Sequence, residues 1–100
     1  MNDVIYSLSI GEVSASVRTP AETIITIVEH GIVEPKGHVP EEWLFEPFML
    51  MRVRKALRMQ RDLELEWAAI ALALDLLEQL KEARADNRRL RQQLDRLLAG

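Results

Sequence analysis

The sequence predicts a mostly α-helical protein, in which a helix-turn-helix with a small β-hairpin wing precedes a long C-terminal coiled-coil helix. Three observations predict this fold. Residues 9–31 hold two short apolar-periodic segments separated by a turn, prolines and glycine punctuate residues 32–45, and neither residue type interrupts residues 64–99. We therefore expect a winged helix-turn-helix-like domain over 1-63 and a long helix, a coiled-coil dimerisation segment, over 64-100.

The first two helices are marked by their ends. Ser9 and Glu12 have the spacing of a capping box, in which each side chain bonds the backbone of the other residue. Pro20 suits the first position of a second helix with Thr19 as its N-cap, and Gly31 suits its C-terminal end. The apolar faces expected to be buried are Ile10, Val13 and Val17 in the first helix and Ile24, Ile27 and Val28 in the second.

The next segment, residues 32–45, reads as two short extended pieces around a turn, which is a small wing. Trp43 and Phe45 alternate with Leu44, so we expect both rings to pack on the domain. Pro47 opens a third helix that runs to about residue 62. One face of that helix is formed by Met49, Val53, Ala56, Leu57 and Gln60.

The long helix begins near Glu64 and Glu66. Its first part, "EWAAIALALDLL", is apolar nearly all round, so we expect it to be buried against the preceding helices, with a partner as a further candidate to cover it. A heptad follows, with residues spaced 3 and 4 apart from Ala73 onward. The residues that we assign to dimerisation are Leu76, Leu80, Ala83, Asn87, Leu90, Leu94 and Leu97.

Self-association is the interpretation that the heptad favours, because a stripe folded back on its own domain would find no second helix to cover it. In a parallel dimer Asp86 of one chain would face Arg91 of the other, whereas an antiparallel dimer would use other pairs. The sequence leaves the orientation open.

Charge is divided unevenly along the chain, whose net charge is -3. Residues 1–50 hold eight acids against two bases, which leaves -6, and residues 51–100 hold eleven bases against eight acids, which leaves +3. The two halves therefore present different fields to a partner.

Reactive groups are scarce. There is no cysteine, the two histidines, His30 and His38, have no metal-ligand spacing, and no nucleophile elbow or phosphate loop is present. We therefore expect no enzymatic activity, no metal and no cofactor. The N-terminal residues lack a basic region before an apolar run, and no apolar run is long enough to span a membrane, so we expect a cytoplasmic protein.

Two charged sets remain as candidates for binding. The acidic set is either an ordinary soluble surface or a docking surface for a basic partner, and it consists of Glu22, Glu29, Glu34, Glu41 and Glu42. The basic set is either a solvated face that pairs with neighbouring acids or a phosphate-contacting surface, and it consists of Arg52, Arg54, Lys55, Arg58 and Arg61.

The order of elements resembles that of the MerR-type winged-helix regulators, with Gly31 and Pro35 at the end of the recognition helix and the start of the wing. The expected basic residues are missing, because "ETIITIVE" contains no base and Glu41 and Glu42 occupy the wing. A narrower resemblance, carried by "GIVEP", "WLF", "DLELEWAAIALALDLL" and "NRRLRQQL", is to the CbpM chaperone-modulator family.

The CbpM resemblance implies binding to the J-domain of the co-chaperone CbpA and inhibition of its stimulation of the Hsp70 chaperone DnaK. J-domains present a basic helix, so the five glutamates of the acidic set are the contacts we expect. The alternatives are a MerR-like DNA-binding transcriptional regulator that uses the arginines of residues 52–61, and a coiled-coil adaptor. We do not expect DNA to be the partner, because DNA binding relies on contacts between phosphates and the side chains of Lys and Arg.

Overall fold

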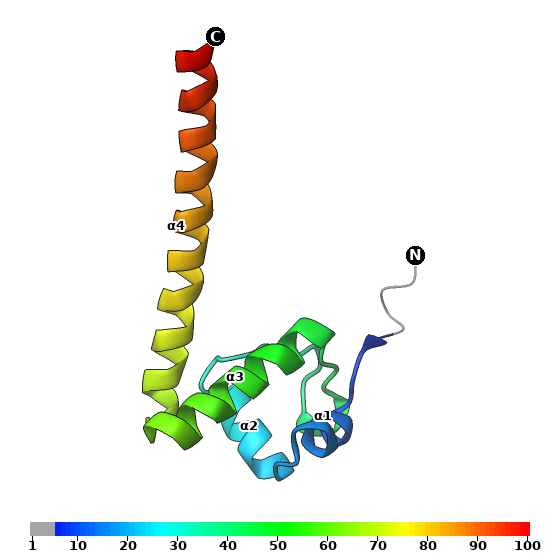
Figure 1. Ribbon diagram of the computed structural model, residues 1–100. Coiled ribbons are helices and arrows are strands. Elements are labelled where there is room, and N and C mark those ends of the chain that lie inside the picture. Colours follow the sequence, from blue (N-terminus) through cyan, green and yellow to red (C-terminus); the bar gives the residue numbers. More distant parts are fainter. Residues whose placement is uncertain (1–5) are drawn as a thin grey trace.

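The structure, a computed structural model, describes residues 6–100 and is mostly helical. Within that range the helices are α1 (Ile10–Val17), α2 (Ala21–Glu29), the 3-10 helix η2 (Pro40–Glu42), α3 (Pro47–Leu63) and α4 (Trp67–Ala99). Figure 1 shows α1, α2 and α3 gathered in one body, from which α4 rises as a long single helix. The predicted fold class is confirmed in its helical part.

The start of α1 follows the prediction, whereas the start of α2 differs from it. The Ser9 amide donates to Glu12 Oε1 over 2.8 Å and the Glu12 amide donates to Ser9 Oγ over 3.1 Å, so the capping box is present. Thr19 is not the cap of α2, because Pro20 keeps an extended ψ of 148° and α2 begins one residue later than expected. The Thr19 hydroxyl instead donates to the Val17 carbonyl over 3.0 Å.

Gly31 ends α2, as predicted. It has a φ of +75°, a left-handed conformation that glycine adopts at little cost. The Gly31 amide donates to the Val28 carbonyl over 2.9 Å, and the Ile32 amide donates to the Ile27 carbonyl over 3.3 Å. This pair of bonds is the Schellman motif, and the two isoleucines that it joins are both buried.

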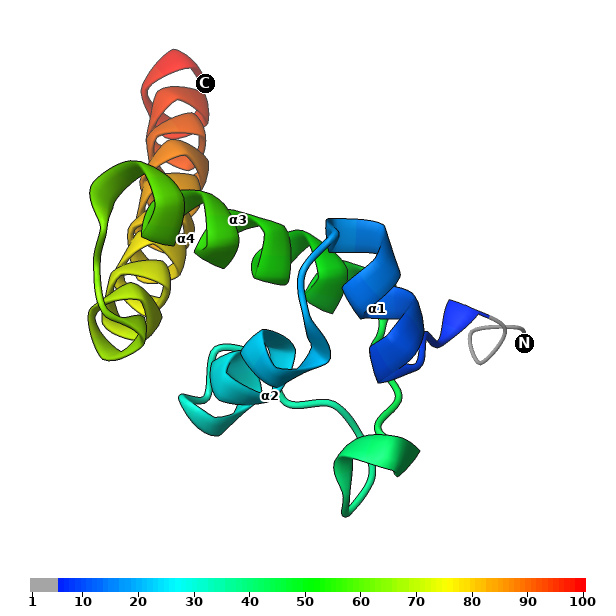
Figure 2. The same cartoon turned by 90° about the horizontal axis from the view of Figure 1, so that it is seen from below.

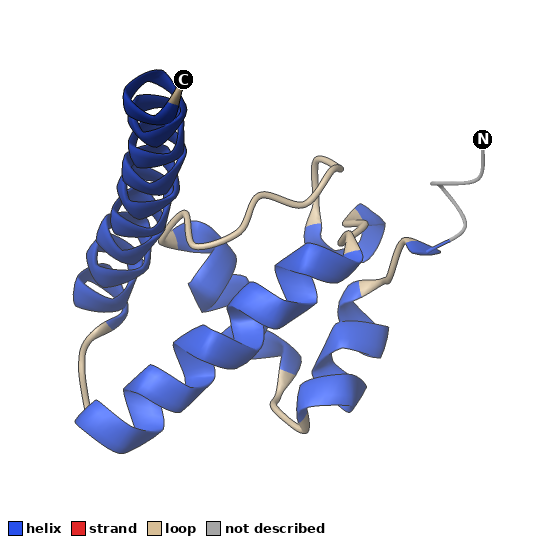
Figure 3. Ribbon diagram, turned by 45° about the horizontal axis from the view of Figure 1, so that its top comes forward, coloured by secondary structure: helices blue, strands red, loops and turns tan. Residues whose placement is uncertain are grey.

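The wing is not confirmed as a β-hairpin, since no strand forms within residues 6–100 and Figure 3 shows a loop there. Lys36 and Leu44 make one antiparallel bridge, with N–O distances of 3.1 and 2.9 Å. Phe45 pairs instead with Leu8, over 2.8 and 2.7 Å. The ladder does not continue toward the tip of the wing because η2 occupies the turn. It does not continue in the other direction because the backbone N–H and C=O of Phe45 are bonded to Leu8.

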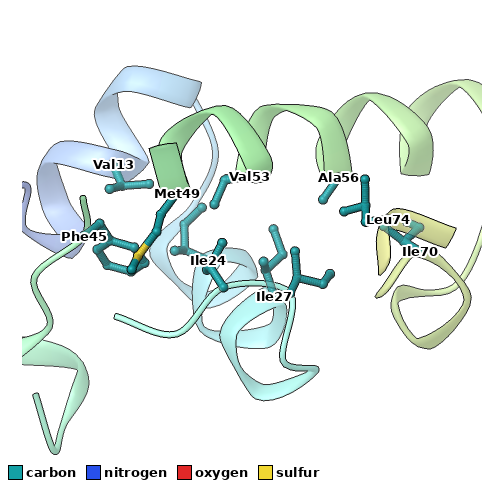
Figure 4. Packing of buried hydrophobic residues seen from close by; sticks show 11 residues of the cluster. Val13, Ile24, Ile27, Phe45, Met49, Val53, Ala56, Ile70 and Leu74 are labelled. Atoms are coloured by element: carbon teal, nitrogen blue, oxygen red, sulfur yellow. The ribbon is translucent and has the colours of Figure 1, made fainter. Parts of the chain in front are cut away.

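The core runs along one face of α3. Figure 4 shows the buried side chains of α3 above those of α2, with Phe45 and Val13 toward one end and Ile70 and Leu74 toward the other. The cluster consists of Val13, Ile24, Ile27, Ile32, Val33, Phe45, Met49, Val53, Ala56, Ile70 and Leu74. The predicted apolar faces of α1, α2 and α3 all contribute to it.

The two aromatic rings of the wing pack as predicted. Phe45 is completely buried and Trp43 is half-buried against the core. Their ring centroids are 6.2 Å apart at an interplanar angle of 86°, which is the edge-to-face arrangement favoured by the ring quadrupoles. The return segment of the wing is therefore held by its aromatic side chains as well as by the backbone bonds of Leu44 and Phe45.

Within the chain, one side of the start of α4 is buried against the preceding helices, as expected, and burial of the other side against a partner stays a prediction. Ile70 and Leu74 are buried, and Trp67 and Ala71 are partly buried beside them. Leu72, in contrast, is 61% exposed. The preceding helices form a single body, and α4 packs against the edge of that body with one of its faces. The division at residues 63 and 64 stays a prediction.

Candidate partner-binding and dimerisation surfaces

The five glutamates of the acidic set lie on three segments. Glu22 is in the first turn of α2 and Glu29 is its last residue, so they are about two turns or 10 Å apart on one face of the helix. Glu34 follows in the extended segment after α2, and Glu41 and Glu42 are on η2. All five side chains are exposed.

Within residues 6–100 these five glutamates form no ion pair. Figure 2 shows the loop that carries η2 projecting from the helical body, apart from α2. The acidic set is therefore a surface spread over α2 and the wing. Only Glu22 and Glu29 share an α-helix, so α2 fixes their positions relative to each other.

The sequence did not predict a groove that lies between the segment after α2, α3 and α4. Its centre is Arg52, whose Nε donates to the Ile32 carbonyl and whose Nη2 lies 2.8 Å from Asp75 Oδ1. Glu78 Oε2 is 3.9 Å from Arg52 Nη1. Arg52 thus joins the segment after α2 to α4, which accounts for its side chain being only 18% exposed.

Two adjoining cavities of about 220 and 310 Å³ make up this groove and share Phe48, Arg52 and Glu78. Phe48 is 62% exposed at its edge, and Glu34 of the acidic set lines the second cavity. Lys55 and Lys81 line the first cavity. The sequence signal for the groove is weak, since Phe48 is an apolar residue just outside the predicted face of α3.

The leucine stripe of α4 points away from the domain to which the helix is attached. Because a helix turns by about 100° per residue, Leu72 and Leu76, each two residues from the buried Leu74, lie about 160° around the axis from it. Every residue from 75 to 100 is exposed in the single chain. The exposed residues of the predicted dimerisation set are Leu76, Leu80, Ala83, Asn87, Leu90, Leu94 and Leu97.

The basic set is divided by the fold. Arg52 turns into the groove, whereas the guanidinium of Arg54 donates to Ser16 Oγ of α1 over 3.0 Å. Arg61 Nε lies 3.0 Å from the carboxylate of its neighbour Asp62. The predicted pairing with neighbouring acids therefore holds for Arg52 and Arg61, whereas the partner of Arg54 is a serine hydroxyl.

Neither histidine lies in a metal-binding cluster. His30 Nδ1 is 2.9 Å from the Thr26 carbonyl, and His38 is exposed in the wing. Among residues 6–100 no group of three or more potential ligands is arranged to hold a metal ion. Over the same part of the chain, no helix has the length and apolar character needed to cross a membrane.

Comparison with known proteins places these surfaces in context. Residues 8–92 match the model of the MerR HTH family regulatory proteins. The chain is 49% identical over 76 residues to the chaperone modulatory protein CbpM of Pseudomonas putida (strain GB-1), covering 76% of this chain and 75% of that protein.

A more distant relative carries the same name. The chaperone modulatory protein CbpM of Coxiella burnetii (strain Dugway 5J108-111) is 42% identical over 74 residues, which cover 74% of this chain and 70% of that protein. These names describe regulators rather than enzymes.

Proposed function

Because the chain belongs to the CbpM family of chaperone modulatory proteins, within the MerR helix-turn-helix family, we propose that it binds the J-domain of a CbpA-type co-chaperone and inhibits its stimulation of DnaK. The observation that carries this proposal is the CbpM similarity over about three quarters of the chain. It is supported by the five glutamates of the acidic set, which are exposed and form no ion pair within residues 6–100.

Electrostatics gives the proposed contact its physical basis. In a DNA-binding regulator of this type, the second helix of the helix-turn-helix would present Lys and Arg side chains to the DNA phosphates. In this chain α2 contains Glu22 and Glu29 and no Lys or Arg. Charge complementarity of this kind accelerates association and selects partners more than it adds affinity. A basic helix of a J-domain is thus a suitable partner for α2, and duplex DNA is not.

The test is a titration of a labelled CbpA-type J-domain with the full chain at about 50 mM salt, where exposed charges are weakly screened. We expect the double variant Glu22→Gln/Glu29→Gln to associate more slowly than the wild type. A matched control is Glu82→Gln, an exposed acid on α4 outside the acidic set. Wild-type binding that is undetectable at this salt concentration would refute the proposal.

The DNA-binding alternative is tested in the same experiment with a duplex DNA arm. It predicts retardation of the duplex, with an affinity that falls steeply as salt rises because counterions are released. DnaK ATPase activity stimulated by the co-chaperone provides the functional readout, and we expect it to fall as the chain is added.

We also propose that α4 mediates a homodimer. The reason is that the stripe around Leu76, Leu90 and Leu94 is exposed and lies opposite the face that docks on the domain. Replacing Leu90 and Leu94 by Ala should lower the sedimentation mass toward that of a monomer. Arg88→Ala/Gln92→Ala, on the other side of the same turns, is the matched control. An unchanged mass in the leucine variant would contradict the dimer.

A further inference from the structure

A second charged surface lies where the end of α1 meets α3, and nothing in the proposed function uses it. It is a hollow of about 470 Å³, lined by arginines from both elements over Val17 and Leu57. Its arginines are Arg18, Arg54, Arg58 and Arg61. No acidic residue lines the hollow, although the chain as a whole has a net charge of -3.

The fold assembles this arginine hollow from distant parts of the sequence. Arg54, Arg58 and Arg61 follow one another at helical spacings of 4 and 3, which places them on one face of α3. Arg18 joins them from the turn after α1, and Ser16 Oγ accepts a hydrogen bond from Arg54 Nη2 over 3.0 Å. The spacing on α3 is visible in the sequence, but the approach of Arg18 is not.

Three of these arginines have no acidic partner among residues 6–100. Within residues 6–100, Arg18, Arg54 and Arg58 form no ion pair, and the one acid partner at the hollow is Asp62 beside Arg61. Like charges four residues apart on a helix, as Arg54 and Arg58 are, repel one another and raise the free energy of the unliganded surface. An anion placed among them would relieve that repulsion.

Arg18 is held in an unfavourable backbone conformation. Its φ of 53° and ψ of 47° are left-handed, a region that side chains other than those of glycine and asparagine rarely adopt. The Arg18 amide donates to the Ala15 carbonyl and the Thr19 amide donates to the Ser14 carbonyl, so this is the same Schellman motif that Gly31 closes after α2. The fold therefore accepts a conformational cost that glycine would avoid, and the result is a guanidinium at the hollow.

We propose that the arginine hollow binds an acidic peptide segment of a partner protein. Guanidinium groups match carboxylates with paired, charge-assisted hydrogen bonds. The half-buried Val17 and Leu57 add an apolar floor, which favours a peptide with an apolar side chain between its acids over a bare phosphate. Duplex DNA is disfavoured, because DNA-binding proteins typically make about 6–10 phosphate contacts and only four arginines are gathered here.

The test uses the full chain and a fluorescent peptide with a central leucine flanked by glutamates, followed by anisotropy at low salt. We expect Arg58→Gln and Arg18→Gly each to weaken binding about two- to fivefold, as for the loss of one exposed ion pair. Arg18→Gly should at the same time keep or raise the melting temperature, since glycine adopts the left-handed conformation freely. The control Arg88→Gln removes the same charge from α4 and should bind as the wild type does.

Three outcomes would overturn the proposal, and a fourth would remove Arg18 from the binding surface. The first is equal binding by the hollow variants and Arg88→Gln. The second is equal binding of a peptide in which glutamines replace the glutamates, which would mean an apolar surface. The third is duplex DNA displacing the peptide at the same salt concentration, which would assign the hollow to nucleic acid. The fourth is a lower melting temperature for Arg18→Gly with unchanged peptide binding, which would limit Arg18 to capping α1.

Discussion

Replacing Arg52 by methionine tests how α4 is fixed to the helix-turn-helix. Methionine keeps an unbranched apolar stem of similar reach and removes every hydrogen bond of the guanidinium. Two of these bonds connect different parts of the fold, since Arg52 donates to the Ile32 carbonyl in the segment after α2 and to Asp75 in α4. The variant therefore removes two tertiary links at once.

The magnitude follows from the burial of each partner. Ile32 is 2% exposed, so loss of a charged donor leaves its carbonyl without that partner, at a cost of about 1.5–3 kcal/mol. The Asp75 side chain is 60% exposed, and its ion pair contributes only about 0.2–1 kcal/mol. We expect Arg52→Met to lower the free energy of unfolding by about 2–4 kcal/mol, most of it from the bond to Ile32.

Urea unfolding followed by circular dichroism measures this difference, at one fixed protein concentration because association would add to the apparent stability. Arg52→Met should lower the midpoint by about 1–2 M. Asp75→Asn, which removes the exposed part of the interaction alone, should cost less than about 1 kcal/mol. If the two variants were destabilised equally, the interaction with Ile32 would contribute nothing and the reasoning would be refuted.

Three further substitutions probe the wing, the core and the stripe. Gly37→Ala should destabilise the fold by more than about 1 kcal/mol in thermal unfolding, because its φ is +122° and an added Cβ would lie 2.7 Å from the Glu42 carbonyl oxygen; an unchanged melting temperature would contradict this. Ile70→Ala should lower the free energy of unfolding by about 2–5 kcal/mol, because Ile70 is completely buried. The α4 side of the core should then be more accessible to solvent, which faster hydrogen exchange in α3 would show. Leu72→Ala, at an exposed position, should lower the free energy of unfolding far less. Asn87→Leu should raise the melting temperature while broadening the distribution of oligomeric states in sedimentation, since a polar residue in a helix seam sacrifices stability for register; a lower melting temperature would place Asn87 outside the seam.

The helix ends were predictable because their determinants are local. The capping box of Ser9 and Glu12 and the left-handed turn at Gly31 involve residues within one turn of each other, so the sequence contains both partners. The helical periodicity that placed Met49, Val53 and Ala56 on one face is local for the same reason. Thr19 shows the limit, because the ψ of Pro20 decided which residue caps α2.

The candidate surfaces were predictable in composition and less so in arrangement. The exposed glutamates of α2 and the wing follow from the surplus of acids in residues 1–50, and the exposed leucines follow from the heptad. Their contacts with a J-domain and with a second chain stay predictions. The groove around Arg52 and the hollow at Arg18 were not foreseen, since each joins side chains that are far apart in the sequence.

The sequence by itself determined the helices, the uneven charge and the apolar repeat of α4, because propensity, capping and periodicity act over a few residues. Only the tertiary structure decided that Leu8 pairs with Phe45, that Arg18 lies beside the arginines of α3, and that Ile70 and Leu74 dock while the leucine stripe faces outward. Those outcomes depend on which faces of distant segments bury the most apolar surface together, and that choice is made by the packed core as a whole.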